Sequence, residues 1–223
     1  MVKAIILLAA ITTFALPAFS QPATRTWEFR VYLDEKPIGF HHFRLTESGD
    51  VLQVSSEARF DVKVLMLNLY RYRHSNRETW ENNCLTSISA ETDANGRNYR
   101  VQGTRANGGF ELDQAGSSTL PPCVMTFAYW NPAFLGEQKL LNAQTGQYEP
   151  VTVKRLDREY LPYGGRQVPS LRYQVVTASG PITLWYHADD SRWLGLESPL
   201  KGGKTLRYEP VAIPGQPVEL ARR

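Results

Sequence analysis

The sequence predicts an all-β protein: a single antiparallel sheet curled into a barrel, half-barrel or β-roll, with one short helix near 122–130. Three observations support this prediction. Apolar and polar residues alternate with a period of two over long stretches, as in strands with one buried and one solvated face. Turn-forming residues recur at the short spacing typical of sandwiches and barrels. Aromatic residues make up 11% of the chain, and these side chains favour pleated, half-buried surfaces.

The chain begins with a segment typical of exported proteins. Lys3 is followed by an apolar stretch, 4–16, and then by the small residues Ala18 and Ser20. A positive start, an apolar middle and small residues before a cleavage point form a secretory signal peptide. The alternative, a membrane anchor, needs roughly 20 apolar residues, more than this stretch supplies. We therefore predict a signal peptide over 1–20, cleavage after Ser20, and no transmembrane segment in the mature chain.

Strand patterns follow the leader. The odd positions of 27–33 are apolar and the even ones mostly polar. In 52–64 the even positions are mostly apolar, with Phe60 among them, and the odd positions are polar or charged, such as Arg59. This alternation predicts one strand, or two in line, with the even side chains buried. The phase breaks at Leu65-Met66-Leu67, which suits a bulge, a strand crossing or an apolar loop.

Turn signals divide the rest of the chain up to Pro210. Asn95-Gly96 is the strongest hairpin signal, because both residues accept a positive φ in a type I′ turn. The segment after Pro210 contains two further prolines and ends in two arginines, which favours a poorly ordered end. The predicted organisation is a signal peptide, a β domain over 21–210 and a flexible tail over 211–223.

One segment departs from the strand pattern. The proline pair at 121–122 suits a helix start and Pro132 suits its end, so we predict the short helix over 122–130. Cys123 lies at its first turn. An even pair of cysteines in an exported protein indicates a disulfide, here with Cys84, which would stabilise the fold by roughly 3–4 kcal/mol. Two free thiols or a reactive dithiol are the alternatives, and the lack of a C-x-x-C motif disfavours the dithiol.

The segment 70–80 is the most unusual one. In strand geometry its even residues share one face, and its odd residues, which include three arginines, share the other. Amphipathic aromatic side chains beside polar groups can line a cavity, which we expect to be mainly apolar and larger than roughly 300 Å³. The arginine row could bind an anion, or form ordinary cross-strand ion pairs. The candidate ligand-binding residues are Tyr72, His74, Trp80, Tyr129, Trp130 and Asn131.

No residue pattern points to catalysis, a metal or a cofactor. The four histidines lack ligand spacing: His41 and His42 would point to opposite faces of a strand, and His74 and His187 stand alone. Nucleophile and phosphate-binding motifs such as G-x-S-x-G and the P-loop are missing. With 25 basic and 22 acidic residues, the charge is too balanced to predict nucleic acid or an anionic membrane as a partner.

Five short segments of the chain are distinctive: Lys36-Pro37-Ile38-Gly39, Tyr70-Arg71-Tyr72-Arg73-His74, Tyr129-Trp130-Asn131-Pro132, Gln144-Thr145-Gly146 and Leu184-Trp185-Tyr186. They resemble segments of a family of bacterial exported proteins known only as a domain of unknown function. The resemblance covers most of the chain after residue 20 and implies a β-rich periplasmic domain. It brings no established activity or catalytic residue. His187 stands where the similar sequences would carry an acidic residue, which weakens a catalytic interpretation of the adjacent Asp189-Asp190.

The sequence favours a periplasmic binding or carrier protein for an apolar or amphipathic, lipid-like ligand, because a strongly curved sheet with an aromatic inner face can hold a cavity. Two other classes stay open. An envelope interaction module without a ligand would have a packed interior and an exposed apolar patch, for which Leu65-Met66-Leu67 is the candidate. An enzyme of unknown type would bring His74, Glu78 and an Asn or Tyr within hydrogen-bond reach. Asn131 could bind a ligand head group, or it could simply end the helix before a proline.

Overall fold

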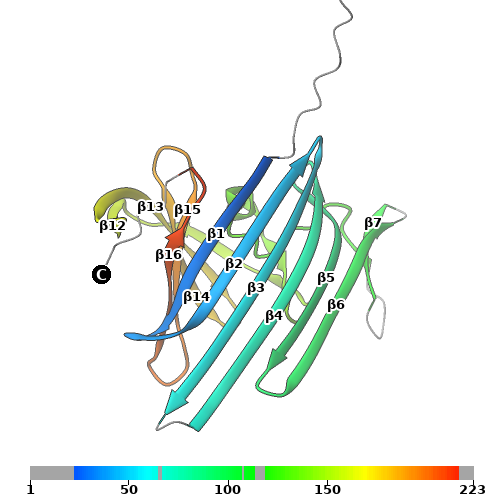
Figure 1. The fold of residues 1–223 in the computed structure, drawn as a ribbon. Helices are drawn as coiled ribbons and strands as arrows, with labels where there is room; N and C mark the ends of the chain where they lie inside the picture. Colours follow the sequence, from blue (N-terminus) through cyan, green and yellow to red (C-terminus); the bar gives the residue numbers. More distant parts are fainter. Residues whose placement is uncertain (1–22, 65–66, 107, 114–118, 216–223) are drawn as a thin grey trace, which may run out of the picture.

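The computed structural model describes residues 23–64, 67–106, 108–113 and 119–215 of the chain (Figure 1). The predicted signal peptide and its cleavage point therefore lie outside the described residues, as do Leu65-Met66 and the last eight positions of the predicted tail. Within the described part, no helix is long and apolar enough to span a bilayer.

The chain forms sixteen strands and one short 3₁₀ helix among its described residues. The first eight strands are β1 (Ala23–Leu33), β2 (Lys36–Ser48), β3 (Val51–Val64), β4 (Leu67–Glu81), β5 (Cys84–Ala94), β6 (Arg97–Ala106), β7 (Gly109–Leu112) and β8 (Thr119–Leu120). The helix η1 (Pro132–Gly136) follows. The remaining strands are β9 (Lys139–Leu141), β10 (Tyr148–Pro150), β11 (Thr152–Arg155), β12 (Glu159–Tyr163), β13 (Arg166–Thr177), β14 (Gly180–His187), β15 (Trp193–Pro199) and β16 (Thr205–Ala212).

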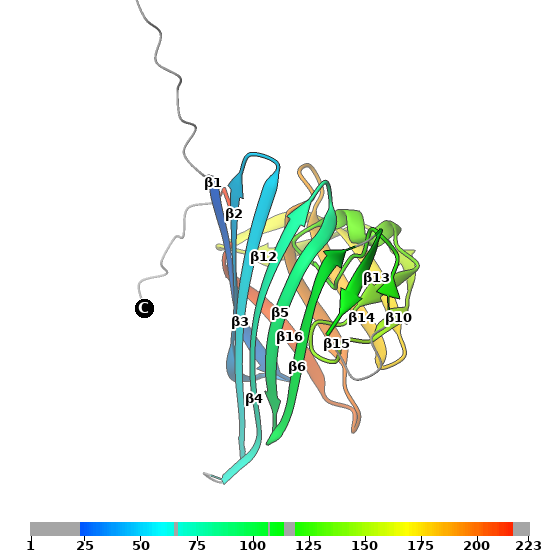
Figure 2. The same cartoon turned by 90° about the vertical axis from the view of Figure 1, so that its right-hand side faces the viewer.

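Fourteen of these strands form one antiparallel sheet. Its order is β11-β13-β14-β15-β16-β1-β2-β3-β4-β5-β6-β7-β8, with β12 also paired to β13, while β9 and β10 form a separate hairpin. The first and last long strands, β1 and β16, pair with each other and join the two halves of the chain. Figures 1 and 2 show the sheet curling, with the segment between β8 and β11 against its concave side. The predicted fold class, a single curled antiparallel sheet, is confirmed.

Bulges and one glycine allow the sheet to curl. The β1 register slips between Glu28 and Phe29 against β16, and again between Val31 and Tyr32 against β2. Bulges of this kind increase the local twist. Opposite Val31 lies Gly39, whose φ is +155°, and a Cβ there would stand 1.8 Å from the carbonyl oxygen of Arg59. Only glycine fits this close approach of two strands, within the first of the distinctive segments.

The alternation in β3 separates core from solvent as the sequence predicts. Val54, Ala58 and Phe60 are buried on the inner face, whereas Glu57 and Arg59 are exposed on the outer one. Large aromatic side chains of other strands and of η1 complete the core, and the largest fully buried ones are Trp27, Phe29, Trp80, Phe110, Phe134, Tyr186 and Trp193.

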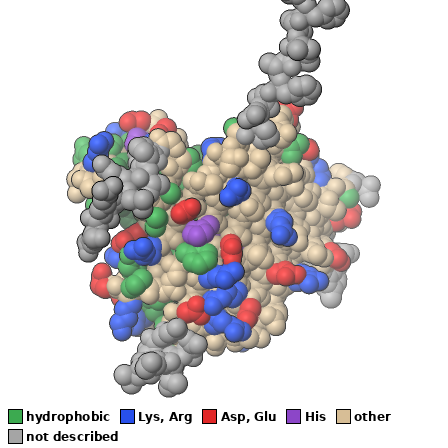
Figure 3. Space-filling model, viewed as in Figure 1, with side chains coloured by type: hydrophobic (Ala, Val, Ile, Leu, Met, Phe, Trp, Pro, Cys, Tyr) green, Lys and Arg blue, Asp and Glu red, His purple; other side chains and the backbone are tan. Residues whose placement is uncertain are grey.

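The outer face carries paired charges. Arg71 lies 2.7 Å from the carboxylate of Asp93, and Arg73 lies 2.8 Å from that of Asp61. Figure 3 shows basic and acidic side chains close together over this face. The structure therefore favours cross-strand ion pairs over an anion site for the arginine row.

The predicted helix over 122–130 is wrong in position and type. That segment forms a parallel bridge between Thr126 and Leu141, and the carbonyl oxygens of Val124 and Met125 accept hydrogen bonds from Leu85 N and Leu141 N. Its backbone groups thus bond to neighbouring strands and not within a helix. The only helix among the described residues is the 3₁₀ turn η1, which begins at Pro132, where the sequence analysis placed the helix end.

The two cysteines form the predicted disulfide, with 4.8 Å between the Cα atoms of Cys84 and Cys123. It ties the start of β5 to the segment on the concave side. The predicted boundary at 210 falls too early, because β16 continues to Ala212 and the Ile213 side chain is buried. The strand and its buried end therefore extend three residues past the predicted boundary.

Candidate ligand-binding site

The inner face of β4 carries a row of polar and aromatic side chains. Tyr72, His74, Asn76, Glu78 and Trp80 lie two residues apart, so a strand presents them all on one face. Asn76, Glu78 and Trp80 are buried, and the other two are half-buried. The row extends inward from the β3–β4 hairpin. Asn76 is a functional candidate that the sequence analysis did not name, and Glu78 was named there only for the enzyme alternative, although the alternation already placed both on this face.

An inner cavity of about 260 Å³ lies between this row and the segment on the concave side. Ser56, a small residue of β3, borders this space, and Ala58 lies two positions further along the same face. Ala58 pairs with His41 on β2 and with His74 on β4, and Ser56 pairs with Phe43 and Asn76 in the same way. A small side chain between two large ones leaves a gap that the facing layer does not fill. The inner cavity is smaller than the roughly 300 Å³ expected for a small-molecule site, and two carboxylates, those of Glu78 and Glu149, border it.

A second cavity, which we call the mouth cavity, has a volume of about 560 Å³. It lies at the end of the sheet where three hairpins turn, β1–β2, β3–β4 and β15–β16. Most of its lining is apolar, and its charged residues are Lys201 and Lys204. The apolar and aromatic lining residues are Leu33, Ile38, Ala58, Phe60, Val62, Tyr70, Tyr72, Leu200, Leu206 and Tyr208.

The two cavities adjoin, because four residues border both of them: His41, Tyr72, Gln144 and Tyr208. These residues are held by mutual contacts. The Tyr72 hydroxyl donates to Gln144 Oε1 at 3.1 Å, and His41 Nδ1 lies 3.2 Å from the Tyr208 hydroxyl. The Tyr72 ring also stacks on Phe60, with ring centroids 5.1 Å apart. Contacts such as His41 with Tyr208 join residues 167 positions apart, so the sequence pattern gave no signal for them.

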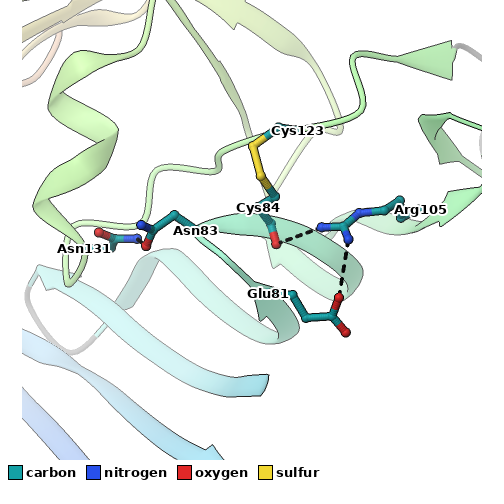
Figure 4. The surroundings of a disulfide bond; sticks show 6 residues. All are labelled: Glu81, Asn83, Cys84, Arg105, Cys123 and Asn131. Carbon is teal, nitrogen blue, oxygen red and sulfur yellow. Dashed lines mark hydrogen bonds and ion pairs between the residues drawn. A yellow bond between two sulfur atoms is a disulfide. The ribbon is translucent and has the colours of Figure 1, made fainter. Parts of the chain in front are cut away.

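Of two tryptophans in contact, Trp130 borders the inner cavity. Trp80 and Trp130 meet edge to face with ring centroids 5.5 Å apart. Beyond them lies a separate depression of about 240 Å³, which Trp80, Trp130 and Asn131 border. Asn131 caps η1 through a hydrogen bond to its side chain from Ala133 N, and its Nδ2 donates to Asn83 beside the disulfide (Figure 4).

The structure thus divides the six candidate residues into two groups. Tyr72, His74, Tyr129 and Trp130 border the inner cavity, whereas Trp80 and Asn131 border only the depression beyond it. Trp80 is fully buried and donates its indole N–H to Glu78. Asn131 begins η1 as its N-cap and does not end a helix as the sequence analysis expected.

Glu78 is the most unusual group of the inner cavity. Its carboxylate accepts hydrogen bonds from Asn76 Nδ2 at 2.8 Å, from Trp80 Nε1 at 2.9 Å, and from the Thr126 side chain. Burial raises the pKa of Glu78, while these three hydrogen bonds act in the opposite direction. A buried carboxylate so firmly held is an acceptor in a fixed position.

The two imidazoles near the cavity are neutral at neutral pH. Burial lowers the pKa of His74 to about 4 and the pKa of His41 well below its usual value. His74 Nδ1 lies 2.8 Å from the Thr92 hydroxyl, and neither group is among the hydrogen-bond partners of Glu78. His74 and Glu78 therefore belong to separate hydrogen-bonded groups, and not to the single cluster that the enzyme hypothesis requires.

The described residues contain no group of three or more histidines, cysteines or carboxylates that could hold a metal ion. A fixed acceptor, a neutral imidazole and an apolar mouth have the chemistry to bind and orient an organic molecule.

The fold is a β domain built as one curled antiparallel sheet, with cavities bordered by its inner face. The chain belongs to the family described as "Domain of unknown function (DUF6134)", which matches residues 29–211. This confirms the resemblance noted from the five distinctive segments. No protein with a curated description matches the sequence.

A solved structure supports the fold. A β-barrel-like protein of another domain of unknown function, DUF1849, from Brucella abortus superposes with a TM-score of 0.60 at 10% identity, over 86% of this chain and 97% of that one. A putative outer membrane lipoprotein-sorting protein domain from Vibrio parahaemolyticus matches 91% of this chain and 87% of its own at 8% identity, but its TM-score of 0.27 carries no inference.

Proposed function

We propose that this protein is exported to the periplasm and there binds or carries an apolar or amphipathic, lipid-like ligand. The mouth cavity is the observation that carries the proposal. Its volume of about 560 Å³ lies within the roughly 300–1,000 Å³ typical of small-molecule sites, and its lining is mainly apolar with few polar groups, as in such sites. The adjoining inner cavity offers a place for the polar end of the same molecule.

Exposed apolar side chains near the mouth support the proposal. Leu200 is 42% exposed, Tyr70 is 39% exposed, and Leu69 on the same hairpin as Tyr70 is 57% exposed. Solitary exposed apolar residues are common, but several around the opening of an apolar cavity are typical of a ligand-binding groove.

The export part of the proposal rests on two features. The first twenty residues have the composition of a signal peptide, and the two cysteines are paired, as is usual in an oxidising compartment. N-terminal sequencing of protein recovered from the periplasmic fraction should give Gln21 as the first residue. Recovery of the uncleaved chain in the cytoplasm would contradict export.

Native mass spectrometry of protein purified from the periplasm tests the ligand. We expect an adduct of lipid-like mass that organic extraction removes. The proposal would be contradicted if protein purified from the periplasm carried no adduct and also failed to bind the apolar dye N-phenyl-1-naphthylamine.

A pair of variants tests whether the mouth cavity is the binding place. Val62→Trp places a large side chain in that cavity, so it should weaken dye binding at least about tenfold through lost space. Val211→Trp is the matched control, because Val211 is exposed on β16 and borders none of the cavities described above. Equal dye affinity in the two variants would show that the dye binds outside the mouth cavity.

A further inference from the structure

Asn76 borders the inner cavity and has a buried acceptor without a partner among the described residues. The residue is 9% exposed, and its Nδ2 donates to Glu78 at 2.8 Å. Its Oδ1 is buried and has no hydrogen-bond partner among the described residues. Buried polar atoms in native proteins almost always have a partner, from protein, ligand or ordered water. A group that fills this cavity therefore gains by donating a hydrogen bond to Asn76.

The charges around the inner cavity are all of one sign. Its charged lining residues are Glu78 and Glu149, and the described lining contains no lysine or arginine. Its histidines, His41 and His74, are held neutral by burial. An anion in this space would face two carboxylates without a cation, and an unpaired buried charge is strongly unfavourable.

His41 offers a second point of contact at the junction of the two cavities. Its Nε2 is buried and has no partner among the described residues, while its Nδ1 faces the Tyr208 hydroxyl. The Tyr208 hydroxyl can donate to Nδ1 or accept from it, so Nε2 can be a donor or an acceptor according to the tautomer. This imidazole can therefore serve a polar group that donates, accepts or does both.

We propose that the inner cavity holds the polar end of the ligand and selects an uncharged or cationic hydrogen-bond donor, a hydroxyl or a primary ammonium, through Asn76 Oδ1 and the Glu78 carboxylate. The inference rests on the proposed lipid-binding function and specifies its ligand class. The apolar chain of the ligand then lies in the mouth cavity and points toward Leu200. Lipids that end in a free carboxylate or phosphate are excluded from the inner cavity.

Three probes with one shared chain test this selectivity: dodecan-1-ol, dodecylamine and dodecanoate, each displacing N-phenyl-1-naphthylamine from the wild-type protein near neutral pH. We expect the alcohol and the amine to bind at least about tenfold more tightly than the carboxylate, a difference of about 1.4 kcal/mol. Dodecanoate binding as tightly as the other two would overturn the inference and leave the carrier function standing. Failure of all three probes and of the dye would overturn the carrier function itself.

Single-residue variants test whether the carboxylates of the inner cavity cause this selectivity. Glu78→Gln keeps the size of the side chain and removes its charge, so we expect dodecylamine to lose about tenfold in affinity and dodecan-1-ol to lose clearly less, since the amine loses an ion pair whereas the alcohol keeps an uncharged acceptor. Glu57→Gln on the outer face of β3 is the matched control and should change neither. If Glu78→Gln does not fold, Glu149→Gln at a half-buried position serves the same measurement. Unchanged dodecylamine binding in a folded cavity variant would overturn the inference.

Discussion

His74 makes the stability of the protein depend on pH. Burial lowers its pKa to about 4 in the folded state, against about 6.5 in an unfolded chain. Between these values the unfolded state binds more protons, so the free energy of unfolding falls as the pH drops from about 6.5 to about 4, by at most about 3 kcal/mol. His41, whose pKa is also lowered, affects stability in the same direction. The pKa of Glu78 is raised by burial, so its contribution to the free energy of unfolding decreases as the pH increases from the unfolded-state pKa to the folded-state pKa of this carboxyl group.

The test compares two histidine variants by urea unfolding at pH 7 and pH 4.5. His74→Gln should reduce the acid-induced loss of stability. His42→Gln is the control, because His42 is exposed on the outer face of the same sheet. Identical pH dependence in the wild type and in His74→Gln would show that the imidazole does not lose its proton affinity on folding.

Phe60 and Arg59 are neighbours on opposite faces of β3, so substitution by aspartate should reduce the stability of the protein by very different amounts at the two positions. Phe60→Asp places a charge on the inner face, against Tyr72 and Tyr208, and should cost several kcal/mol. Arg59→Asp removes an exposed ion pair with Glu57, which contributes at most about 1 kcal/mol. Equal losses of melting temperature would show that the inner and outer faces are assigned incorrectly.

The disulfide should stabilise the fold mainly by restricting the unfolded chain. Cys84 and Cys123 are separated by 39 positions, and a closed loop of that length corresponds to roughly 3–4 kcal/mol in the loop-entropy model. The double variant Cys84→Ser, Cys123→Ser should unfold at lower urea by that amount. A reducing agent should lower the stability of the wild type and leave the double variant unchanged. A double variant as stable as the wild type would contradict this account.

Local pattern predicted the strands well and the short helix badly. The alternation in 52–64 is a property of one strand and its burial, so the sequence alone contains it. The helix prediction used two prolines as a start signal, but Val124 and Met125 bond to Leu85 and Leu141, which are far away in the sequence. Tertiary hydrogen bonding overrides a local start signal whenever such partners are available.

The candidate site shows the same division between local and long-range information. Tyr72 and His74 were predictable, because aromatic and polar residues alternate along one strand. The cavity itself depends on Ser56 and Ala58, two small residues that acquire their meaning only when β2 and β4 lie on either side of them. Pairing of β1 with β16, which brings Tyr208 to His41, likewise joins the two ends of the chain, and no spacing in the sequence encodes it.

The continuous sheet and shared core predict a single cooperative unfolding unit. Leu112 on β7 and Leu184 on β14 lie toward opposite ends of the strand order, and both are almost fully buried. They belong to one cluster of buried residues. Because strand pairing runs without a break between them, loss of packing at either end should weaken the entire domain.

Leu112→Ala and Leu184→Ala test this cooperativity as a matched pair. Each deletes the same buried atoms and should cost about 2–5 kcal/mol. Each should also lower the midpoint of a single unfolding transition. Circular dichroism follows the strands and tryptophan fluorescence follows the aromatic core, and the two signals should change together because unfolding is two-state. Transitions that separate in one variant and coincide in the other would show that the two halves, joined at β1 and β16, unfold independently.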